Sequence, residues 1–232
     1  MIDIHSHFLP GIDDGARNAS ESVEMLSDCF KKGVKLCAAT PHLSIHSQDD
    51  IERFLENRLT AVRRLNEELA RTKAEVPRLL YGAEIYLDND ISAFDGLDRL
   101  CISGTRLMLV ELSEFRRNSG YAEWLYSLNA KGILPILAHV ERYEYFDWLY
   151  DELSGVDVVY QVNADTLLSM KGRRFLLDLH NSGRPVLVSG DMHNMTSRRN
   201  RMGEARKKLG LLHKNAAERL FGGLAGELLG VD

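Results

Sequence analysis

Seven short apolar runs alternate with amphipathic segments along the chain. Strands in such an alternation pair in parallel, because each intervening helix returns the chain to the same end of the sheet. Seven of them fit either an open doubly wound sheet or a closed α/β barrel. No glycine-rich nucleotide-binding fingerprint follows any run, which favours the barrel. The predicted strands are 2–5, 34–40, 79–85, 107–112, 133–138, 156–162 and 185–189.

Helical segments separate these runs. The clearest is 51–69, where seven apolar residues follow i, i+3, i+4 spacing. Another helix is expected to begin near Ser20, before the acidic stretch 21–24, and to end at Gly33. No linker, repeat or low-complexity segment divides the sequence, so we expect one domain over residues 1–232. Further helices are predicted at 122–131, 171–182, 198–209 and 214–221.

Composition excludes several classes of protein. The formal net charge of −5 gives no basic surface for nucleic acid or for an anionic membrane. The three cysteines form no C-x-x-C pair, which argues against a disulfide framework and favours a reducing cytosol. No run approaches the roughly 20 apolar residues that span a bilayer. We therefore expect a cytoplasmic protein with no nucleic-acid partner and no membrane insertion.

Residues of metal-binding types stand at the end of nearly every predicted strand. His5 and His7 end the first strand, and the alternation of side chains sends both to the same side. The carboxyl ends of parallel strands form one face, so these groups are expected to converge. A structural hydrogen bond or a helix cap explains each residue alone, but neither explains the recurrence. The residues are His5, His7, Asp13, Asp14, His42, Glu84, Glu111, His139, Asn163, Asp191 and His193.

The predicted ligand set indicates a hydrolytic metal site. Mixed imidazole and carboxylate ligands suit Zn, Mn or Fe, and a structural zinc site would contain thiolates. Carboxylates can bridge two metals about 3.5–4 Å apart and so lower the pKa of a bound water to about 7. The positive field of such a cluster would also hold the dianion of a phosphate monoester.

A cysteine-based phosphatase is excluded by spacing. Such enzymes need an arginine six residues after the nucleophilic cysteine, within a loop that cradles phosphate. All three cysteines are expected to pack in the interior instead. At that offset Cys29, Cys37 and Cys101 are followed by Lys35, Leu43 and Leu107.

Five motifs carry a family resemblance: His-Ser-His at 5–7, Pro-Gly-Ile-Asp-Asp-Gly at 10–15, Gly-Ala-Glu-Ile-Tyr at 82–86, His-Val-Glu-Arg-Tyr at 139–143 and Ser-Gly-Asp-Met-His-Asn at 189–194. In this order they resemble the PHP (polymerase and histidinol phosphatase) superfamily. Within it they are most similar to the bacterial manganese-dependent protein tyrosine phosphatases of capsule and exopolysaccharide operons. The resemblance extends from the first residues to about Leu209.

The resemblance implies a distorted (β/α)7 TIM-like barrel, one PHP-type metallophosphatase domain, with three divalent metal ions. Manganese is the expected metal, and Fe, Zn or Co are also compatible with the ligands. The family's pattern, carried onto this sequence, gives His5, His7 and Asp191 to one metal with Glu84 bridging, Glu111 and His139 to a second, and Asp14, His42 and His193 to a third.

Two arginines match those that clamp the phosphate in this family, Arg142 and Arg198. For Arg142 the alternative is an ion pair with Glu141 or Glu144. Arg198 lies in the basic run 198–201, which could instead be a solvated helix start, and Arg199 competes for the same role. The loop at 195–200 lacks the prolines usual in the tyrosine phosphatases, so these motifs predict phosphatase chemistry more strongly than they predict the substrate.

The expected function is hydrolysis of phosphotyrosine on a protein, a bacterial tyrosine autokinase that regulates capsule or exopolysaccharide synthesis. A metal-bound hydroxide would attack phosphorus in line. The main alternative is histidinol-phosphate hydrolysis, which shares the barrel and the ligands. An amidohydrolase is disfavoured because Glu111 stands where those enzymes carry a carbamylated lysine. A nucleic-acid phosphodiesterase lacks a basic groove, and a non-catalytic binding module would not need a complete ligand set.

Overall fold

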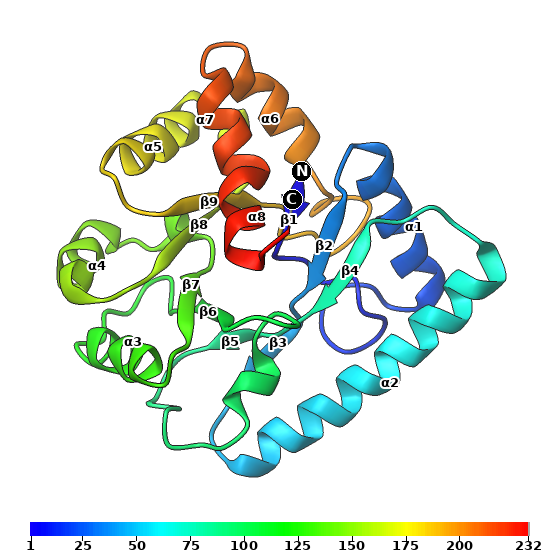
Figure 1. The fold of residues 1–232 in the computed structure, drawn as a ribbon, viewed down its shortest axis with the longest axis horizontal. Coiled ribbons are helices and arrows are strands. Elements are labelled where there is room, and N and C mark those ends of the chain that lie inside the picture. Colours follow the sequence, from blue (N-terminus) through cyan, green and yellow to red (C-terminus); the bar gives the residue numbers. More distant parts are fainter. Residues whose placement is uncertain (232) are drawn as a thin grey trace.

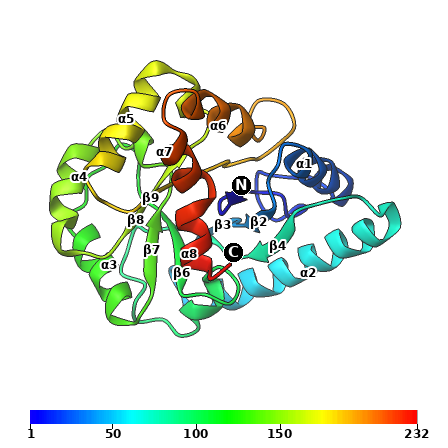
Figure 2. The same ribbon diagram turned by 45° about the horizontal axis from the view of Figure 1, so that its top comes forward.

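The computed structural model describes residues 1–231, and every strand pair in that part of the chain is parallel. The strands form two sheets, with the orders β1-β2-β4 and β3-β5-β6-β7-β8-β9. Helices surround these strands on the outside (Figures 1 and 2). The strands are β1 (Ile2–Asp3), β2 (Leu36–Ala39), β3 (His42–Ser44), β4 (Arg78–Tyr81), β5 (Glu84–Tyr86), β6 (Leu107–Glu111), β7 (Leu134–Leu137), β8 (Val159–Asn163) and β9 (Val186–Ser189).

The two sheets are parts of one ring with seven strand positions. β2 continues into β3 after a two-residue break, and β4 continues into β5 in the same way. Backbone hydrogen bonds from Gly82 N to Ala39 O (2.8 Å) and from Glu84 N to Pro41 O (3.0 Å) carry the ladder across both breaks. The sequence prediction of a strand over 79–85 therefore corresponds to two shorter strands in line, and the strand at 42–44 was not predicted.

The ring closes between its first and last strands. Asp191 N donates to His5 O at 2.9 Å, and His7 N donates to Met192 O at 2.8 Å, just beyond the ends of β9 and β1. A parallel bridge between Ser6 and Met192 accompanies these bonds. The predicted fold class, a distorted α/β barrel with seven strand positions, is confirmed.

Side chains alternate along each strand, so that one set forms an inner core and the other set an outer core. On β6, Leu107 and Leu109 point into the barrel, whereas Met108 and Val110 pack against the surrounding helices. The C-terminal helix α8 (Leu224–Leu229) adds two buried residues to the inner cluster and lies across the centre of the ring in Figure 1. The inner core comprises Ile4, Leu36, Ala38, Leu80, Ile102, Leu107, Leu109, Ile136, Ala138, Val159, Leu187, Leu224 and Ala225.

Toward the carboxyl ends of the strands, the inward positions become polar. Gln161 and Asn163 follow Val159 on β8, and Ser189 follows Leu187 on β9. All three polar side chains are buried. A polar layer in the barrel interior must be satisfied by hydrogen bonds or by ions. The apolar layer beneath it supplies the rigid base on which the candidate site stands.

Each predicted helical segment corresponds to a helix of the structure, with differences at the ends. α6 (Met202–Gly210) begins at Met202 instead of residue 198, because the side chain of Asn200 is buried against Asp3 and holds the preceding residues in a loop. The short helices α4 and α8 were not predicted. No helix within residues 1–231 is both long enough and apolar enough to cross a bilayer. The remaining helices are α1 (Ala19–Lys31), α2 (Gln48–Thr72), α3 (Tyr121–Ala130), α4 (Phe146–Glu152), α5 (Met170–Asn181) and α7 (Lys214–Glu218).

Candidate metal centre

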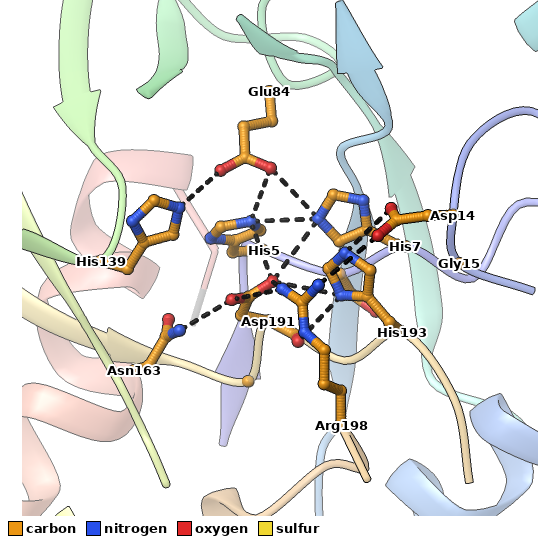
Figure 3. A network of polar contacts seen from close by, with 12 residues as sticks. His5, His7, Asp14, Gly15, Glu84, His139, Asn163, Asp191, His193 and Arg198 are labelled. Atoms are coloured by element: carbon orange, nitrogen blue, oxygen red, sulfur yellow. Dashed lines mark hydrogen bonds and ion pairs between the residues drawn. The ribbon is translucent and has the colours of Figure 1, made fainter. Parts of the chain in front are cut away.

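A single carboxylate lies at the centre of the polar face. Glu84 begins β5, and its side chain is 1% exposed. Its Oε2 atom lies 3.1 Å from His5 Nε2, 3.2 Å from His7 Nε2 and 3.1 Å from His42 Nδ1. Its Oε1 atom lies 3.1 Å from His139 Nε2. Four imidazoles from three places in the sequence therefore meet one carboxylate, and Figure 3 shows three of them, His5, His7 and His139, around Glu84.

Two further carboxylates continue the cluster on either side of His42. Glu111, the last residue of β6, places Oε1 3.4 Å from His139 Nε2 and Oε2 3.9 Å from His42 Nδ1. Asp14 places Oδ1 3.4 Å from His42 Nε2 and 3.2 Å from His193 Nε2. His42 therefore joins the Glu84–Glu111 group to the Asp14–His193 group.

Asp191 forms the base of the cluster. Its Oδ1 atom lies 3.5 Å from His5 Nε2, 3.6 Å from His7 Nε2 and 3.3 Å from His193 Nδ1. Asn163 donates a 2.7 Å hydrogen bond to its other oxygen. The structure thus brings together all nine side chains that the sequence predicted as ligands. Three overlapping groups have ligand atoms within 4.8 Å of one another: His7, Asp14, His42 and His193; His5, His7 and Glu84; and His42, Glu84 and Glu111.

Residues behind the imidazoles fix their orientation. Asp13 Oδ2 lies 2.7 Å from His7 Nδ1, and Gln161 Oε1 lies 2.9 Å from His5 Nδ1. Gln161 also accepts a 2.8 Å hydrogen bond from the backbone N–H of His139. In both rings Nε2 faces the cluster. The same arrangement is usual in metal sites, where one ring nitrogen of a histidine binds the metal and the other forms a hydrogen bond with a neighbouring residue. Asp13 was among the residues of metal-binding types expected at the strand ends, and it supports a ligand instead. Gln161 was not predicted, although its inward register two residues before Asn163 was a usable signal.

Backbone strain is stored at two of the candidate ligands. His139 has φ = 33° and Asp191 has φ = 49°, both in the left-handed region that disfavours residues with a Cβ. Such conformations cost on the order of 1–3 kcal/mol and persist where surrounding contacts determine them. Asp191 N is held by His5 O, and His139 N by Gln161, so the strain aims both side chains inward.

The charges in the cluster favour cations. Burial alone would raise the pKa values of Glu84 and Asp191, but the nearby imidazoles hold both pKa values well below their usual range. Burial disfavours protonation of His7, yet its bonds to Asp13 and Glu84 prevail and raise its pKa to about 10. The carboxylates therefore remain ionised and attract positive charge.

The crowded arrangement fits metal ions better than hydrogen bonds. His5 Nε2 and His7 Nε2 lie 3.2 Å apart. A proton between these two nitrogens would form one hydrogen bond and leave their other close contacts without one. Glu84 Oε2 and His193 Nε2 are buried and have no hydrogen-bond partner of acceptable geometry in the described residues. Oxygen and nitrogen donors that converge without hydrogen bonds are what a carboxylate–imidazole metal site requires.

Two arginines lie beside the cluster. Arg142 Nη2 lies 2.8 Å from Asp191 Oδ2, and Arg198 Nη2 lies 3.0 Å from both oxygens of the same carboxylate. Arg199 turns away and pairs with Glu204 at 3.1 Å. The geometry therefore places Arg198 next to the cluster and gives Arg199 different surroundings.

The alternative ion pairs for Arg142 are not formed. Its second acidic neighbour is Glu114, at 3.8 Å. Glu141 instead accepts hydrogen bonds from Asn163 N and Thr166 Oγ1, both 3.0 Å long. Arg142 thus remains directed toward Asp191.

Gly15 provides a test of the loop that carries Asp13 and Asp14. A Cβ at this position would lie 1.9 Å from His7 O and 2.6 Å from His7 Cβ. Gly15→Ala is expected to lower the free energy of unfolding by roughly 1–3 kcal/mol. Because the loop also orients His7, metal affinity should fall about 10–100-fold. Urea unfolding and metal titration measure the two effects.

The matched control is Gly155→Ala, because a Cβ at that position meets nothing within 4 Å. Its free energy of unfolding should stay within roughly 0.5 kcal/mol of the wild type. Equal effects of the two substitutions would show that the contact between Gly15 and His7 does not constrain the loop.

Comparisons with known proteins identify relatives over most of the chain. Tyrosine-protein phosphatase YwqE of Bacillus subtilis (strain 168) is 32% identical over 211 residues, which cover 85% of this chain and 79% of the relative. Tyrosine-protein phosphatase CpsB of Streptococcus pneumoniae is 29% identical over 218 residues, which cover 85% of each chain.

The fold is shared with a solved relative. A chain from the crystal structures of YwqE from Bacillus subtilis and CpsB from Streptococcus pneumoniae, described as unique metal-dependent tyrosine phosphatases, superposes with a TM-score of 0.81 at 24% identity. The superposition covers 99% of this chain and 94% of the other. A family model described as "Capsular polysaccharide synthesis, CpsB/CapC" matches residues 1–229. Because that match spans nearly the whole chain, the protein belongs to the CpsB/CapC family of capsular polysaccharide synthesis.

Proposed function

We propose that this protein is a metal-dependent phosphatase that hydrolyses phosphotyrosine on a protein. The observation that carries the proposal is the position of Glu84, whose carboxylate meets four imidazoles while two arginines lie beside the adjacent Asp191. Cation-binding donors next to guanidinium groups are suited to a phosphate dianion. Relatives over 85% of the chain are named tyrosine-protein phosphatases.

Three divalent metals, most simply Mn, with Fe, Zn or Co as alternatives, are part of this proposal. His5, His7 and Asp191 would hold one metal, Glu111 and His139 a second, and Asp14, His42 and His193 a third, with Glu84 shared between metals. Bound divalent cations supply Lewis-acid stabilisation of the phosphoryl oxygens and a water of lowered pKa. The close approach of Asp14, His42 and His193 supports the third of these sites. The distances of 3.4 Å between Glu111 and His139, and of 3.5 and 3.6 Å from Asp191 to His5 and His7, support the other two.

The chain's own residues would bind and orient the substrate. Arg142 and Arg198 now share the carboxylate of Asp191. A metal on that carboxylate would compete with them, and their N–H groups would be available to the oxygens of the phosphate. Planar guanidinium groups match such oxygens in pairs. Asp13 and Gln161 would keep the rings of His7 and His5 fixed, so that the donors need no rearrangement during the reaction.

The proposed partner is a phosphotyrosine-bearing protein, and a bacterial tyrosine autokinase of polysaccharide export is the candidate. The family's description as capsular polysaccharide synthesis supports that setting. We place the reaction in the cytoplasm, because Cys29, Cys37 and Cys101 are all buried as free thiols, as in a reducing compartment.

Two substrates separate this proposal from its nearest rival. The Mn-loaded protein is incubated with a phosphotyrosine peptide and, in parallel, with histidinol phosphate, and released phosphate is measured. We expect kcat/KM to be at least about 10²-fold higher for the peptide, because contacts with the remainder of a peptide also stabilise its transition state. Turnover of histidinol phosphate alone would contradict the proposal and favour the small-molecule phosphatase.

A further inference from the structure

A second basic feature lies next to the candidate metal centre and is not needed to hold metals. It is a cavity of about 180 Å³ at the ends of β8 and β9. None of the five imidazoles of the cluster lines it, nor do Glu84 and Glu111. Its wall is shared with the metal centre through Asp191, Asn163, Arg142 and Arg198. The lining residues are Arg142, Asn163, Asp165, Gly190, Asp191, Ser197, Arg198, Arg199 and Arg201.

The loop that carries three of these arginines is anchored at its centre. Asn200 is fully buried, donates to Asp3 Oδ2 at 2.9 Å and accepts from Met202 N at 3.1 Å. The loop packs so closely that a Cβ on Gly190 would lie 2.8 Å from Asn200 Nδ2. The residues on either side of Asn200 are therefore held at the cavity by a buried side chain.

The lining of the cavity carries more guanidinium groups than carboxylates. Four arginines face it, against Asp165 and Asp191. Two of the four have a further acidic neighbour outside the lining, because Glu114 lies 3.8 Å from Arg142 and Asp14 lies 3.6 Å from Arg198. Outside the lining, Glu204 pairs with Arg199 at 3.1 Å and with Arg201 at 2.7 Å. One carboxylate cannot neutralise two guanidinium groups. Positive charge therefore remains beside the phosphate clamp, and it has room for a group of several atoms because one water occupies only about 30 Å³.

We infer that this cavity is a second anion subsite, which binds an acidic group of the substrate peptide near the phosphotyrosine. The inference rests on the proposed function. Arg142 and Arg198 stand between the two places, so the reacting phosphate would lie on the cluster side of these arginines. A carboxylate of Asp or Glu, or the phosphate of a neighbouring phosphotyrosine, would bind on the other side, with Arg199 and Arg201. Guanidinium groups bind both kinds of anion through paired hydrogen bonds.

The test compares peptides within each protein. Three peptides share one phosphotyrosine and differ in their flanks, which carry neutral residues, Asp and Glu, or a second phosphotyrosine. We expect wild-type kcat/KM to be about 3-fold higher with the acidic flank and about 10-fold higher with the second phosphate, mainly through KM. For each charged flank, the ratio of its kcat/KM to that of the neutral peptide should fall as ionic strength rises, because the subsite is partly exposed.

Substitutions test whether Arg199 and Arg201 form the subsite. In Arg199→Gln with Arg201→Gln, both ratios should fall to about 1, and a general loss of folding or metal cancels because each ratio is taken within one protein. Glu204→Gln should keep or raise the ratios, because it removes the carboxylate that competes for both arginines. Arg63→Gln, on the exposed face of α2, is the matched control and should leave the ratios unchanged.

The outcomes separate the two proposals. If wild-type protein hydrolyses the neutral peptide and both ratios are close to 1, the subsite is wrong and the phosphatase proposal remains. If the ratios are high but survive the double substitution, another surface recognises the anion and the assignment to this cavity fails. If no phosphotyrosine peptide is hydrolysed, the proposed function itself fails.

Discussion

Glu84→Gln is expected to remove bound metal and to lower phosphatase turnover by at least about 10³-fold. The substitution keeps the shape of the side chain but removes the negative charge that meets His5, His7, His42 and His139. An amide also cannot bridge two cations as a carboxylate does. Metals in such sites contribute several kcal/mol of charge stabilisation in the transition state, and each 1.4 kcal/mol is tenfold in rate.

The measurement combines metal analysis and phosphotyrosine-peptide turnover on one sample. Glu56→Gln, at an exposed position on α2, is the matched control and should keep both metal and activity. Circular dichroism and thermal unfolding establish that the variant is folded. Full turnover in folded Glu84→Gln would contradict the proposed bridging role of this carboxylate.

Arg198→Gln is expected to lower kcat by about 10²–10³-fold while the metal content stays close to that of the wild type. The guanidinium reaches both oxygens of Asp191, and we propose that it meets the equatorial oxygens of a bound phosphate. Removal of one such preorganised donor in other enzymes costs about 2.7–4 kcal/mol of transition-state stabilisation. Arg142→Gln should act in the same direction.

Steady-state kinetics on the neutral-flanked peptide, with metal analysis, measure this effect. Arg63→Gln loses the same charge at an exposed position on α2, so it controls for the change in net charge and should match the wild type. Arg198→Lys should recover only part of the loss, because an ammonium group cannot form the paired hydrogen bonds of a guanidinium. A loss of metal equal to the loss of activity would show that Arg198 supports the cluster and does not contact the phosphate.

The strand ends were predictable because two simple rules act there. Side chains alternate along a strand, and the carboxyl ends of parallel strands share one face, so His5, Glu111 and Asp191 were expected to meet. The break between β4 and β5 was not predictable. It depends on the neighbouring strand, where Pro41 O accepts the hydrogen bond from Glu84 N across the gap. Contacts of this kind are invisible in a local pattern.

The residues that support the ligands were harder to identify. Asp13 does act as a turn residue, because its Oδ1 accepts from Gly15 N at 3.0 Å, but its other oxygen contacts His7. Gln161 lies within an apolar run that predicts only a strand. The separate roles of Arg198 and Arg199 depend on how Asn200 is buried, a contact that joins residues nearly 200 positions apart in the chain. Sequence patterns identify side chains of metal-binding types more readily than the residues that hold them in place.

The most direct test of the central claim is a metal titration of chelator-treated protein, with phosphotyrosine-peptide turnover followed as Mn is added. We expect the stripped protein to stay folded and inactive. Activity should return with added metal and saturate near three equivalents of bound Mn per chain, as the donors around Glu84 become filled. Undiminished turnover by folded, metal-free protein would show that the reaction does not depend on the metal.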